Sequence, residues 1–361
     1  HRDLHSFPTR RSSDLELFCG LFGVLAEGNY SDEATGERTG RSVLHLAEPL
    51  SRSARELGLS EAELGERLER ARATLFELRA ARPRPCRDDK VLTDWNGLMI
   101  SALALAARAF GDEALARAAR RAADFLLSRM LLPDGALLHR YRDGEAAQRG
   151  FLDDYAFLAG GLIDLYEATA ELGYLRAARE LTRYQLEHFW DEERGGFYLA
   201  ADDSDPLIVR SRDIYDGALP SGNSISLLNL ARLGRILGEP DLALRGRRIA
   251  DTFAPTVRQA PMAFTQVLLS VCHLRWPGLL VAVAGPAAAP ETAALLRAAR
   301  AAYNPCGTVF FRGAAGEDAE ILELMPHLAG LEARRSAAYV QADGTWEPAI
   351  TEPAELLARL S

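Results

Sequence analysis

The chain has 361 residues, of which 48% are hydrophobic, and a formal net charge of −9 at pH 7. An acidic chain lacks the basic stripe that a nucleic-acid groove requires, so we expect no nucleic-acid partner. No apolar run approaches the roughly 18 residues of a membrane helix, so we expect no membrane span either.

The first fifteen residues, HRDLHSFPTRRSSDL, match letter for letter the translation of a common sequencing adapter. We therefore interpret residues 1–15 as an assembly artefact and leave them out of the expected fold. Their opening His-Arg-Asp-Leu resembles the catalytic loop of protein kinases, but Pro8 stands where that loop has its metal-binding Asn. The four cysteines are far apart in the sequence, which is typical of a reduced, cytoplasmic chain.

Residues 16–59 are expected to form a linker and the segment that leads into a helical region. From Ser60 to about Leu274 the pattern predicts one helix after another, because apolar residues recur at helical spacing between capping and breaking residues. The expected helices cover residues 60–82, 96–110, 113–130, 153–171, 174–190, 222–238, 240–254 and 261–274.

These helices are expected to pair into a repeat. Gly111, Gly173 and Gly238 are 62 and 65 residues apart, and each is interpreted as the turn between two helices. The first helix of each pair is the more apolar, and the second carries Arg and Glu. An inner apolar ring and an outer charged ring predict an α/α toroid over residues 60–275.

The pattern changes after Trp276 to short apolar strands that alternate with helices. LLVAVAGP, GTVFFRG and AAYVQ are the expected strands, with helices at 290–303 and near 319–328 between them. Residues 276–361 are therefore expected to form a small parallel α/β subdomain. The segment lacks a G-x-G-x-x-G motif, and we expect no cofactor.

Polar side chains gather where the inner helices are expected to begin. Helix N-termini in alternating hairpins face the same end of a toroid, so these side chains are expected to converge on one funnel. The expected substrate-binding residues are Asp89, Lys90, Asp94, Trp95, Asn96, Asp153, Tyr155, Tyr198, Arg212, Asp213, Ser221 and Asn223.

Asp154 and Asp216 are the expected acid/base pair. Glycoside chemistry uses one carboxylic acid to protonate the leaving oxygen and a second carboxylate as base or nucleophile. Asp89 and Lys90 are expected to support them electrostatically, and Trp95, Tyr155 and Tyr198 to form a stacking wall for a sugar.

Simpler roles explain several of these residues equally well. Asp94, Asp153 and Ser221 stand at natural N-cap positions, and DGALPSGNS also suits a turn that opens a helix. For His139 and His188 a structural role and an acid/base role are both open. No cluster of His, Cys and Asp has metal-ligand spacing, so we expect no metal.

The segments DDKVLTDWNGLMISALA, FLDDYAFLAGGLIDLYEAT, GGFY and DGALPSGNS resemble the family of YyaL-type thioredoxin-domain-containing proteins, the relatives of spermatogenesis-associated protein 20. The resemblance covers essentially all of residues 17–361. It implies an (α/α)6 toroid similar to those of N-acylglucosamine 2-epimerases and six-hairpin glycosidases, preceded by a thioredoxin-like domain and by first hairpins that this chain lacks.

Two positions depart from the family pattern. Gln341 and Trp346 stand where the family has two cysteines near its C-terminus, and Arg210 and Arg212 replace an Arg-x-Lys pair. The fold class implied is thus mainly α, an (α/α)6 toroid truncated at its N-terminal side with a small C-terminal α/β appendage.

The expected function is that of a carbohydrate-active or sugar-binding toroid of the glycosidase or epimerase kind. The alternative is a non-catalytic scaffold that binds a client for the thioredoxin-like domain. The expected partners are accordingly a sugar or glycan ligand and that missing domain.

Overall fold

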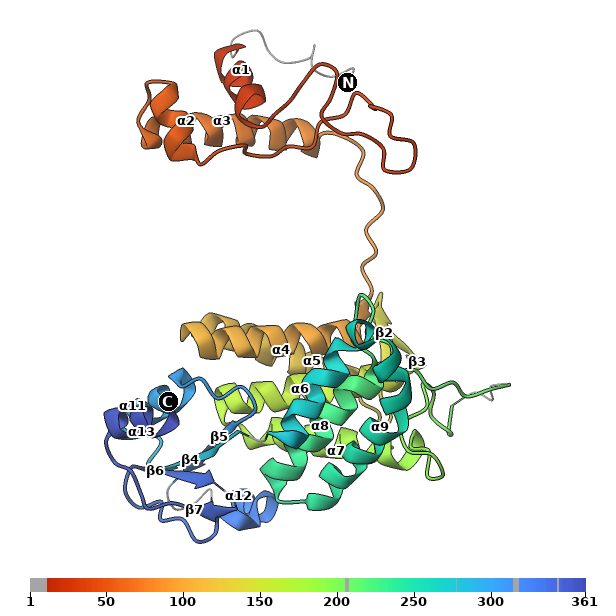
Figure 1. Cartoon of the computed structure of the whole chain (residues 1–361), viewed down its shortest axis with the longest axis vertical. Helices are drawn as coiled ribbons and strands as arrows, with labels where there is room; N and C mark the ends of the chain where they lie inside the picture. The colour runs from red at the N-terminus through yellow and green to blue at the C-terminus, as the bar shows by residue number, and fades with distance from the viewer. Residues whose placement is uncertain (1–11, 205–207, 277, 314–317, 343) are drawn as a thin grey trace. The chain divides into compact units, whose positions relative to one another are not determined.

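The computed structural model describes residues 12–204, 208–276, 278–313, 318–342 and 344–361 (Figure 1). The chain divides into two compact units, His1–Asp88 and Asp89–Ser361. Of the stretch interpreted as an artefact, residues 1–11 lie outside the described residues. The residues expected to carry function belong to the second unit.

The first unit contains three helices, α1 (Ser12–Leu21), α2 (Leu50–Glu56) and α3 (Glu61–Ala80). Helix α3 begins where the sequence predicts, because Ser60 and Glu63 form a capping box in which each side chain accepts a hydrogen bond from the other residue's backbone N–H.

The second unit is built from α-hairpins, as the sequence predicts. Its inner helices are α4 (Thr93–Phe110), α6 (Leu152–Thr169), α8 (Gly222–Leu237) and α10 (Thr265–Arg275), and each packs on the next. The outer helices are α5 (Glu113–Arg129), α7 (Leu172–His188) and α9 (Pro240–Gln259), which cover α4, α6 and α8 respectively. This alternation is the hairpin arrangement of an α/α toroid.

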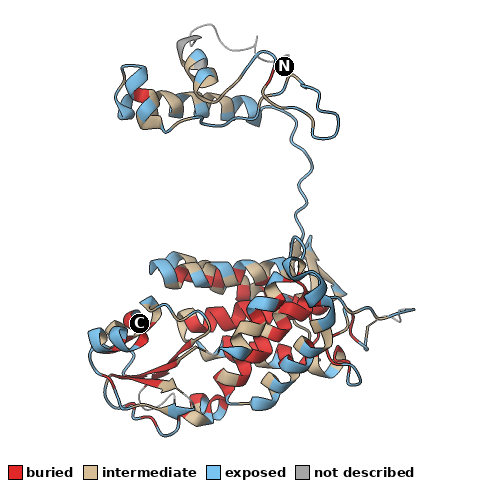
Figure 2. Ribbon diagram, in the orientation of Figure 1, coloured by how far each residue is buried: buried red, intermediate tan, exposed pale blue. Residues whose placement is uncertain are grey.

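Burial separates the two sets of helices, as Figure 2 shows. Almost every residue of α6 from Asp154 to Glu167 is buried. The outer helix α5 buries only Ala116, Ala119, Ala123 and Leu126, one stripe at helical spacing. The expected inner apolar and outer charged sets are therefore confirmed.

Two of the three predicted glycine turns are present. Gly111 and Gly238 cap α4 and α8 in the left-handed conformation, with φ of 67° and 71°. The expected cap at Gly173 is wrong: Ala170 takes the left-handed conformation (φ 64°), and Gly173 lies inside α7. The turn comes three residues earlier because α6 ends at Thr169, not at the expected residue 171.

The last two helices of the hairpin region differ from their expected bounds. Helix α9 continues through Pro255 to Gln259, five residues beyond the expected end. The segment expected to open the next helix forms a short 3-10 turn, η2 (Pro261–Ala263), and α10 begins only after it.

Helices α4 and α6 cross in close contact at two glycines. A Cβ on Gly97 would lie 2.5 Å from the Leu158 amide nitrogen, and a Cβ on Gly161 would lie 2.5 Å from the Gly97 carbonyl oxygen. Both neighbours are backbone atoms, which cannot move aside as a flexible side chain can. The glycines thus allow the approach that brings the N-terminal ends of α4 and α6 together.

We expect Gly97→Ala to lower the free energy of unfolding by about 1–3 kcal/mol, because overpacking at the crossing outweighs the gain in helix propensity. Urea denaturation measures the change. Gly173→Ala is the matched control: Gly173 is also helical and its added Cβ would meet nothing within 4 Å, so this variant should be neutral or slightly more stable. Equal effects of the two substitutions would contradict the packing argument.

A three-stranded antiparallel sheet lies beside the N-terminal ends of α4 and α6. Its strands are β1 (Val91–Leu92), β2 (Leu138–Arg142) and β3 (Glu145–Arg149), in the order β1-β2-β3. After α7, the chain forms an isolated antiparallel bridge between Trp190 and Phe197.

The C-terminal part is a four-stranded sheet with helices, and its topology corrects one expectation. Its strands are β4 (Leu280–Gly285), β5 (Thr308–Gly313), β6 (Ala337–Ala342) and β7 (Thr345–Trp346), in the order β5-β4-β6-β7. Its helical segments are α11 (Pro290–Ala301), α12 (Asp318–Leu324), η3 (Pro326–Leu328) and α13 (Pro353–Leu360). Strands β4 and β5 are parallel as expected, but β6 runs antiparallel to β4.

The reversal of β6 has a topological cause. Strand β5 ends beside Gly285 and β6 begins beside Ala284, so the chain passes from β5 to β6 at one end of the sheet and β6 then runs back along β4. No helix among the described residues is long and apolar enough to cross a membrane.

Candidate functional site

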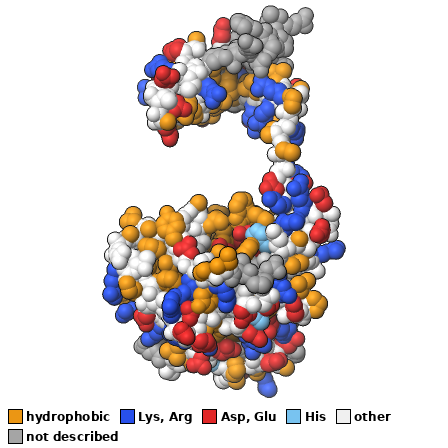
Figure 3. Space-filling view, turned by 90° about the vertical axis from the view of Figure 1, so that its right-hand side faces the viewer, with side chains coloured by type: hydrophobic (Ala, Val, Ile, Leu, Met, Phe, Trp, Pro, Cys, Tyr) orange, Lys and Arg blue, Asp and Glu red, His pale blue; other side chains and the backbone are white. Residues whose placement is uncertain are grey.

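The candidate site lies where α4, α6 and α8 begin, next to β2. Four titratable side chains meet there, Asp94, His139, Asp153 and Asp154, and we call them the acidic centre. Figure 3 shows the face of this unit that carries the β2–β3 hairpin: hydrophobic side chains surround a hollow, with acidic and histidine side chains beside it.

Asp154 is buried and ties three elements together. Its carboxylate accepts hydrogen bonds from the backbone N–H of Phe151 (2.8 Å) and of Asp94 (3.0 Å), so it caps α6 and holds the start of α4. His139 Nδ1 donates to the same carboxylate at 3.0 Å from β2. Burial raises the pKa of Asp154 above its ordinary value, although the hydrogen bonds from His139 and Phe151 act in the opposite direction.

His139, for which the sequence left a structural and an acid/base role open, is a hydrogen-bond partner of Asp154. Its hydrogen bond to Asp154 raises the pKa of His139 above its ordinary value, although burial acts in the opposite direction. The His139 ring also meets the Phe151 ring edge-on, with centroids 5.5 Å apart. The sequence contained one signal for this role, the position of His139 in an extended segment before the α6 cluster.

The pKa of the Asp153 carboxyl is raised. Burial raises the pKa of Asp153 to about 6, and the charge of Asp154 is the second cause. The backbone N–H of Gly222 donates a hydrogen bond to it. A Cβ on Gly222 would lie 2.3 Å from Asp153 Oδ1, so only glycine at this position permits the contact between α6 and α8.

Three aromatic side chains are exposed at the starts of α4 and α6 and in the loop before α8. Trp95 is 59% exposed, Tyr215 57% and Phe151 42%. The sequence predicted Trp95 as part of a stacking wall and missed the other two. Tyr155 was also expected in this wall, but its side chain is only 1% exposed, so that prediction is wrong. Because α6 is buried on all sides, the Tyr155 ring lies in the core and stacks on Tyr184.

Tyr198 and Arg212 belong to a separate cluster around Asp191. The Tyr198 hydroxyl donates to the Asp191 carboxylate at 2.9 Å, and Arg212 pairs with the same carboxylate at 3.0 Å. The guanidinium groups of Arg210 and Arg212 lie over the Tyr198 ring, 4.4 and 5.7 Å from its centroid. The Tyr198 ring, which was expected to stack on a sugar, is therefore already in contact with these two arginines.

Asp216 has its hydrogen-bonding capacity largely filled by backbone. Its Oδ1 accepts from the Ser221 N–H at 3.0 Å, and its Oδ2 accepts from Gln266 N–H (2.8 Å) and Val267 N–H (3.1 Å), which caps α10. The expected acid/base pairing of Asp216 with Asp154 stays a prediction.

The loop before α8 is held by the other polar residues of the DGALPSGNS segment. Ser221 is the N-cap of α8, and its hydroxyl accepts the Ser224 N–H at 3.1 Å. The Asn223 side chain donates to the carbonyls of Phe197 and Asp213 at 2.9 and 2.8 Å. Asp213 Oδ1 accepts the Tyr215 N–H at 2.9 Å. Capping and loop support thus account for these contacts.

The remaining predicted residues lie at the start of α4. Asp89 pairs with Arg142 on β2 at 2.9 Å, and the Asn96 side chain donates to the Leu92 carbonyl at 2.8 Å. Lys90 lies near enough to His139 for its charge to act against protonation of the imidazole.

Among the residues that the structure describes, two groups of side chains have ligand atoms within 4.8 Å of one another, close enough to hold a metal ion. They are Asp94 with His139 and Asp154, and His188 with Asp202 and Asp203. In each group a histidine Nδ1 is already hydrogen-bonded to a carboxylate, His139 to Asp154 and His188 to Asp202 at 2.8 Å. A metal would have to replace these bonds, so the expectation of no metal is retained as a prediction.

Comparison with known proteins gives relatives over most of the chain. The chain is 31% identical over 356 residues to human spermatogenesis-associated protein 20, covering 94% of this chain and 45% of that protein. An uncharacterized protein of Caenorhabditis elegans is 29% identical over 275 residues, covering 73% and 37%. The chain thus spans about half the length of the curated relatives it matches. No family model matches.

Solved structures show similarity to parts of the chain. Cellobiose 2-epimerase from Bacillus thermoamylovorans is 17% identical, with a TM-score of 0.41 over 47% of this chain and 46% of that one. A family 76 α-mannanase from Bacteroides thetaiotaomicron is 16% identical, with a TM-score of 0.41 over 48% and 47%.

Proposed function

This chain is a homologue of spermatogenesis-associated protein 20 over 94% of its length. Because that name gives no reaction, we propose a function from the site. We propose that the second unit binds a carbohydrate and performs acid/base chemistry on it. The observation that carries this proposal is the Asp153 carboxyl: burial raises its pKa to about 6, and exposed Phe151 and Trp95 belong to the same segments as Asp153 and Asp94.

Asp153 is suited to donate a proton. A carboxyl group with a pKa near 6 is still largely protonated in weakly acidic solution, and glycosidases raise the pKa of their general acid in this way. The proton would go to a glycosidic or hydroxyl oxygen of the bound sugar. Burial and the charge of Asp154 are what keep the proton on Asp153.

His139 and Asp154 act as positioning residues. The Asp154 carboxyl holds the starts of α4 and α6 by accepting backbone N–H groups, and His139 donates a further hydrogen bond to it. Asp94 supplies the second carboxylate of the proposal, because it is partly exposed and its charge contributes to the raised pKa of Asp153.

The exposed rings supply the apolar surface that a sugar needs. The faces of sugar rings carry C–H groups, which pack on aromatic faces, while the hydroxyl groups require polar partners. Trp95 follows Asp94 directly at the start of α4, and Phe151 contacts the His139 ring. Charged and aromatic groups are therefore combined at one end of the hairpins.

The test begins with a panel of oligosaccharides and the full chain. We expect at least one saccharide to bind, and Trp95→Ala to weaken that binding about tenfold or more, as loss of a stacking ring does in binding sites. Isothermal titration calorimetry measures the affinity, and NMR of the sugar follows turnover. Phe110→Ala is the matched control, an 80% exposed ring at the other end of α4.

Each outcome distinguishes the proposals. Failure of every saccharide to bind would contradict the carbohydrate site. Binding without turnover would favour the alternative of a binding scaffold for a thioredoxin-like domain. A Phe110→Ala variant as impaired as Trp95→Ala would show that the effect is not local to the site.

A further inference from the structure

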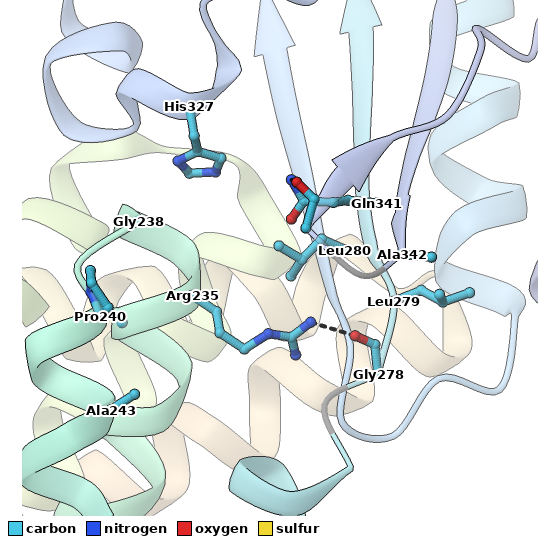
Figure 4. A pocket seen from close by; sticks show the side chains of 12 residues that line it. Arg235, Gly238, Pro240, Ala243, Gly278, Leu279, Leu280, His327, Gln341 and Ala342 are labelled. Carbon is cyan, nitrogen blue, oxygen red and sulfur yellow. Dashed lines mark hydrogen bonds between the residues drawn. The ribbon is translucent and has the colours of Figure 1, made fainter.

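A second pocket lies between the helical hairpins and the C-terminal sheet (Figure 4), and no residue lining it belongs to the acidic centre. Its volume is about 570 Å³, within the range of small-molecule sites. The described lining residues are Gly234, Arg235, Gly238, Pro240, Ala243, Gly278, Leu279, Leu280, His327, Gln341, Ala342 and Gly344.

The charge of this pocket comes from Arg235. Its Nη1 donates to the Cys306 carbonyl at 2.9 Å and its Nη2 to the Gly278 carbonyl, so two neutral acceptors hold the guanidinium in place. No carboxylate among the described residues pairs with it. Arg232, one turn earlier on α8, differs: it pairs with Asp164 at 2.7 Å and Glu167 at 3.1 Å.

A partly buried guanidinium without an anionic partner is unusual, because burial costs a charge much of its hydration. Burial lowers the pKa of Arg235 from its ordinary value, but arginine remains protonated. Three of its five N–H groups are not used by the two carbonyls. An anion in the pocket would neutralise the charge of the Arg235 guanidinium and accept hydrogen bonds from its unused N–H groups.

The other polar groups on the wall are neutral. Burial lowers the pKa of His327, so its imidazole is uncharged at neutral pH, and neither ring nitrogen has a hydrogen-bond partner among the described residues. Both nitrogens are themselves buried, so His327 contributes an uncharged ring to the wall and not a polar contact. The Gln341 side chain donates to the Gly344 carbonyl at 3.3 Å.

We propose that this pocket binds a small monocarboxylate with an apolar body. One cation and no other charge on the described wall match the single negative charge of a carboxylate better than the two charges of a phosphate, and the planar guanidinium matches a carboxylate in shape. Leu279, Leu280 and Pro240 offer apolar contacts to the rest of the ligand. A bound ligand would join the α8–α9 turn to the C-terminal sheet.

The test uses the full chain with benzoate and hexanoate as probes, and with benzyl alcohol and hexanol as neutral analogues of similar shape. Ligand-observed saturation-transfer NMR and calorimetry measure binding. We expect each carboxylate to bind at least tenfold more tightly than its alcohol, and Arg235→Gln to remove that difference. Arg247→Gln is the matched control, an exposed arginine on α9 outside this pocket.

A second variant tests the pocket without touching its charge. Arg235 also holds two carbonyls, so Arg235→Gln could impair folding; Ala243→Leu instead fills the pocket from α9 and should abolish carboxylate binding while Arg235 stays in place. The proposal is overturned if neither carboxylate binds, if both variants bind like the wild type, or if inorganic phosphate competes more strongly than either carboxylate.

Discussion

Replacing Arg232 by methionine should lower the free energy of unfolding by about 3–5 kcal/mol at pH 7, the range found when one partner of a buried ion pair is removed. Arg232 lies between the inner helices, and its side chain is 12% exposed. Its Nη2 pairs with Asp164 and Glu167, whose side chains are 8% and 3% exposed. The substitution leaves the charge of Asp164 without a cation, and Ser101 remains as its hydrogen-bond donor.

The loss should depend on pH in a defined direction. Burial opposes ionisation of Glu167, but Arg232 and Arg108 hold its pKa below the ordinary value. A lowered folded-state pKa contributes stability above the unfolded-state pKa, about 4.3, and this stability is lost as pH falls through the folded value. Without Arg232 the Glu167 carboxyl protonates more easily, so the difference between variant and wild type should shrink between pH 7 and pH 5.

Urea denaturation at the two pH values measures both effects. Arg183→Met is the matched control, because Arg183 pairs with Glu180 on the surface at 64% side-chain exposure and should change stability by less than about 0.5 kcal/mol. The double variant Arg232→Met with Asp164→Asn should recover part of the loss, since it removes the unpaired charge as well. A loss below about 1 kcal/mol, equal at both pH values, would refute the role of the ion network.

The sequence predicts the helices of the second unit well because their signals are local. Alternating apolar and charged helices identify the inner and outer sets, and Gly111 and Gly238 mark two turns correctly. The turn at Ala170 was missed because alanine rarely adopts the left-handed conformation. Gly173, which adopts it readily, lies nearby and was predicted as the turn instead. The direction of β6 was missed because AAYVQ is a buried apolar run in either orientation, and only the path of the chain decides it.

The site is less predictable because burial and partner choice are not local. Asp153 and Asp154 are adjacent in sequence, and burial raises the pKa of both. They differ in their partners: Asp154 accepts hydrogen bonds from three segments, whereas Asp153 accepts one from the backbone of Gly222. Tyr155 resembles a surface aromatic in the motif but points into the core. The pairing of His139 with Asp154 joins residues that sit on different elements, so periodicity alone does not reveal it.

Replacing Asp153 by asparagine should make the protein more stable at pH 8 and, if the proposed function holds, remove its activity. A folded-state pKa of about 6 against about 3.9 in the unfolded chain means that ionised Asp153 costs about 3 kcal/mol. Because the folded value is the higher one, stability is greatest below the unfolded pKa and falls as pH rises through 6. Asparagine removes the ionisation, so we expect a gain of about 1–3 kcal/mol at pH 8 and about half of that gain at pH 5.

Asp216→Asn is the matched control, and it should have the opposite sign. The Asp216 carboxylate accepts three backbone N–H groups with two oxygens, whereas an asparagine side chain has one acceptor oxygen, so stability should fall by about 1–2 kcal/mol. Thermal melts at pH 5 and pH 8 compare the variants. An Asp153→Asn variant no more stable than the wild type at pH 8 would contradict the buried, raised-pKa carboxyl.

Activity then separates a proton donor from a merely buried acid. On any saccharide that the wild type converts, Asp153→Asn should lower kcat by about 10²–10⁴-fold, the usual contribution of general acid catalysis, and remove the limb of the pH–rate profile near pH 6. Since the variant is expected to be folded and more stable, lost activity cannot be assigned to unfolding. A stabilised variant that keeps its activity and its pH profile would remove Asp153 from the mechanism and leave it a costly buried charge without a catalytic role.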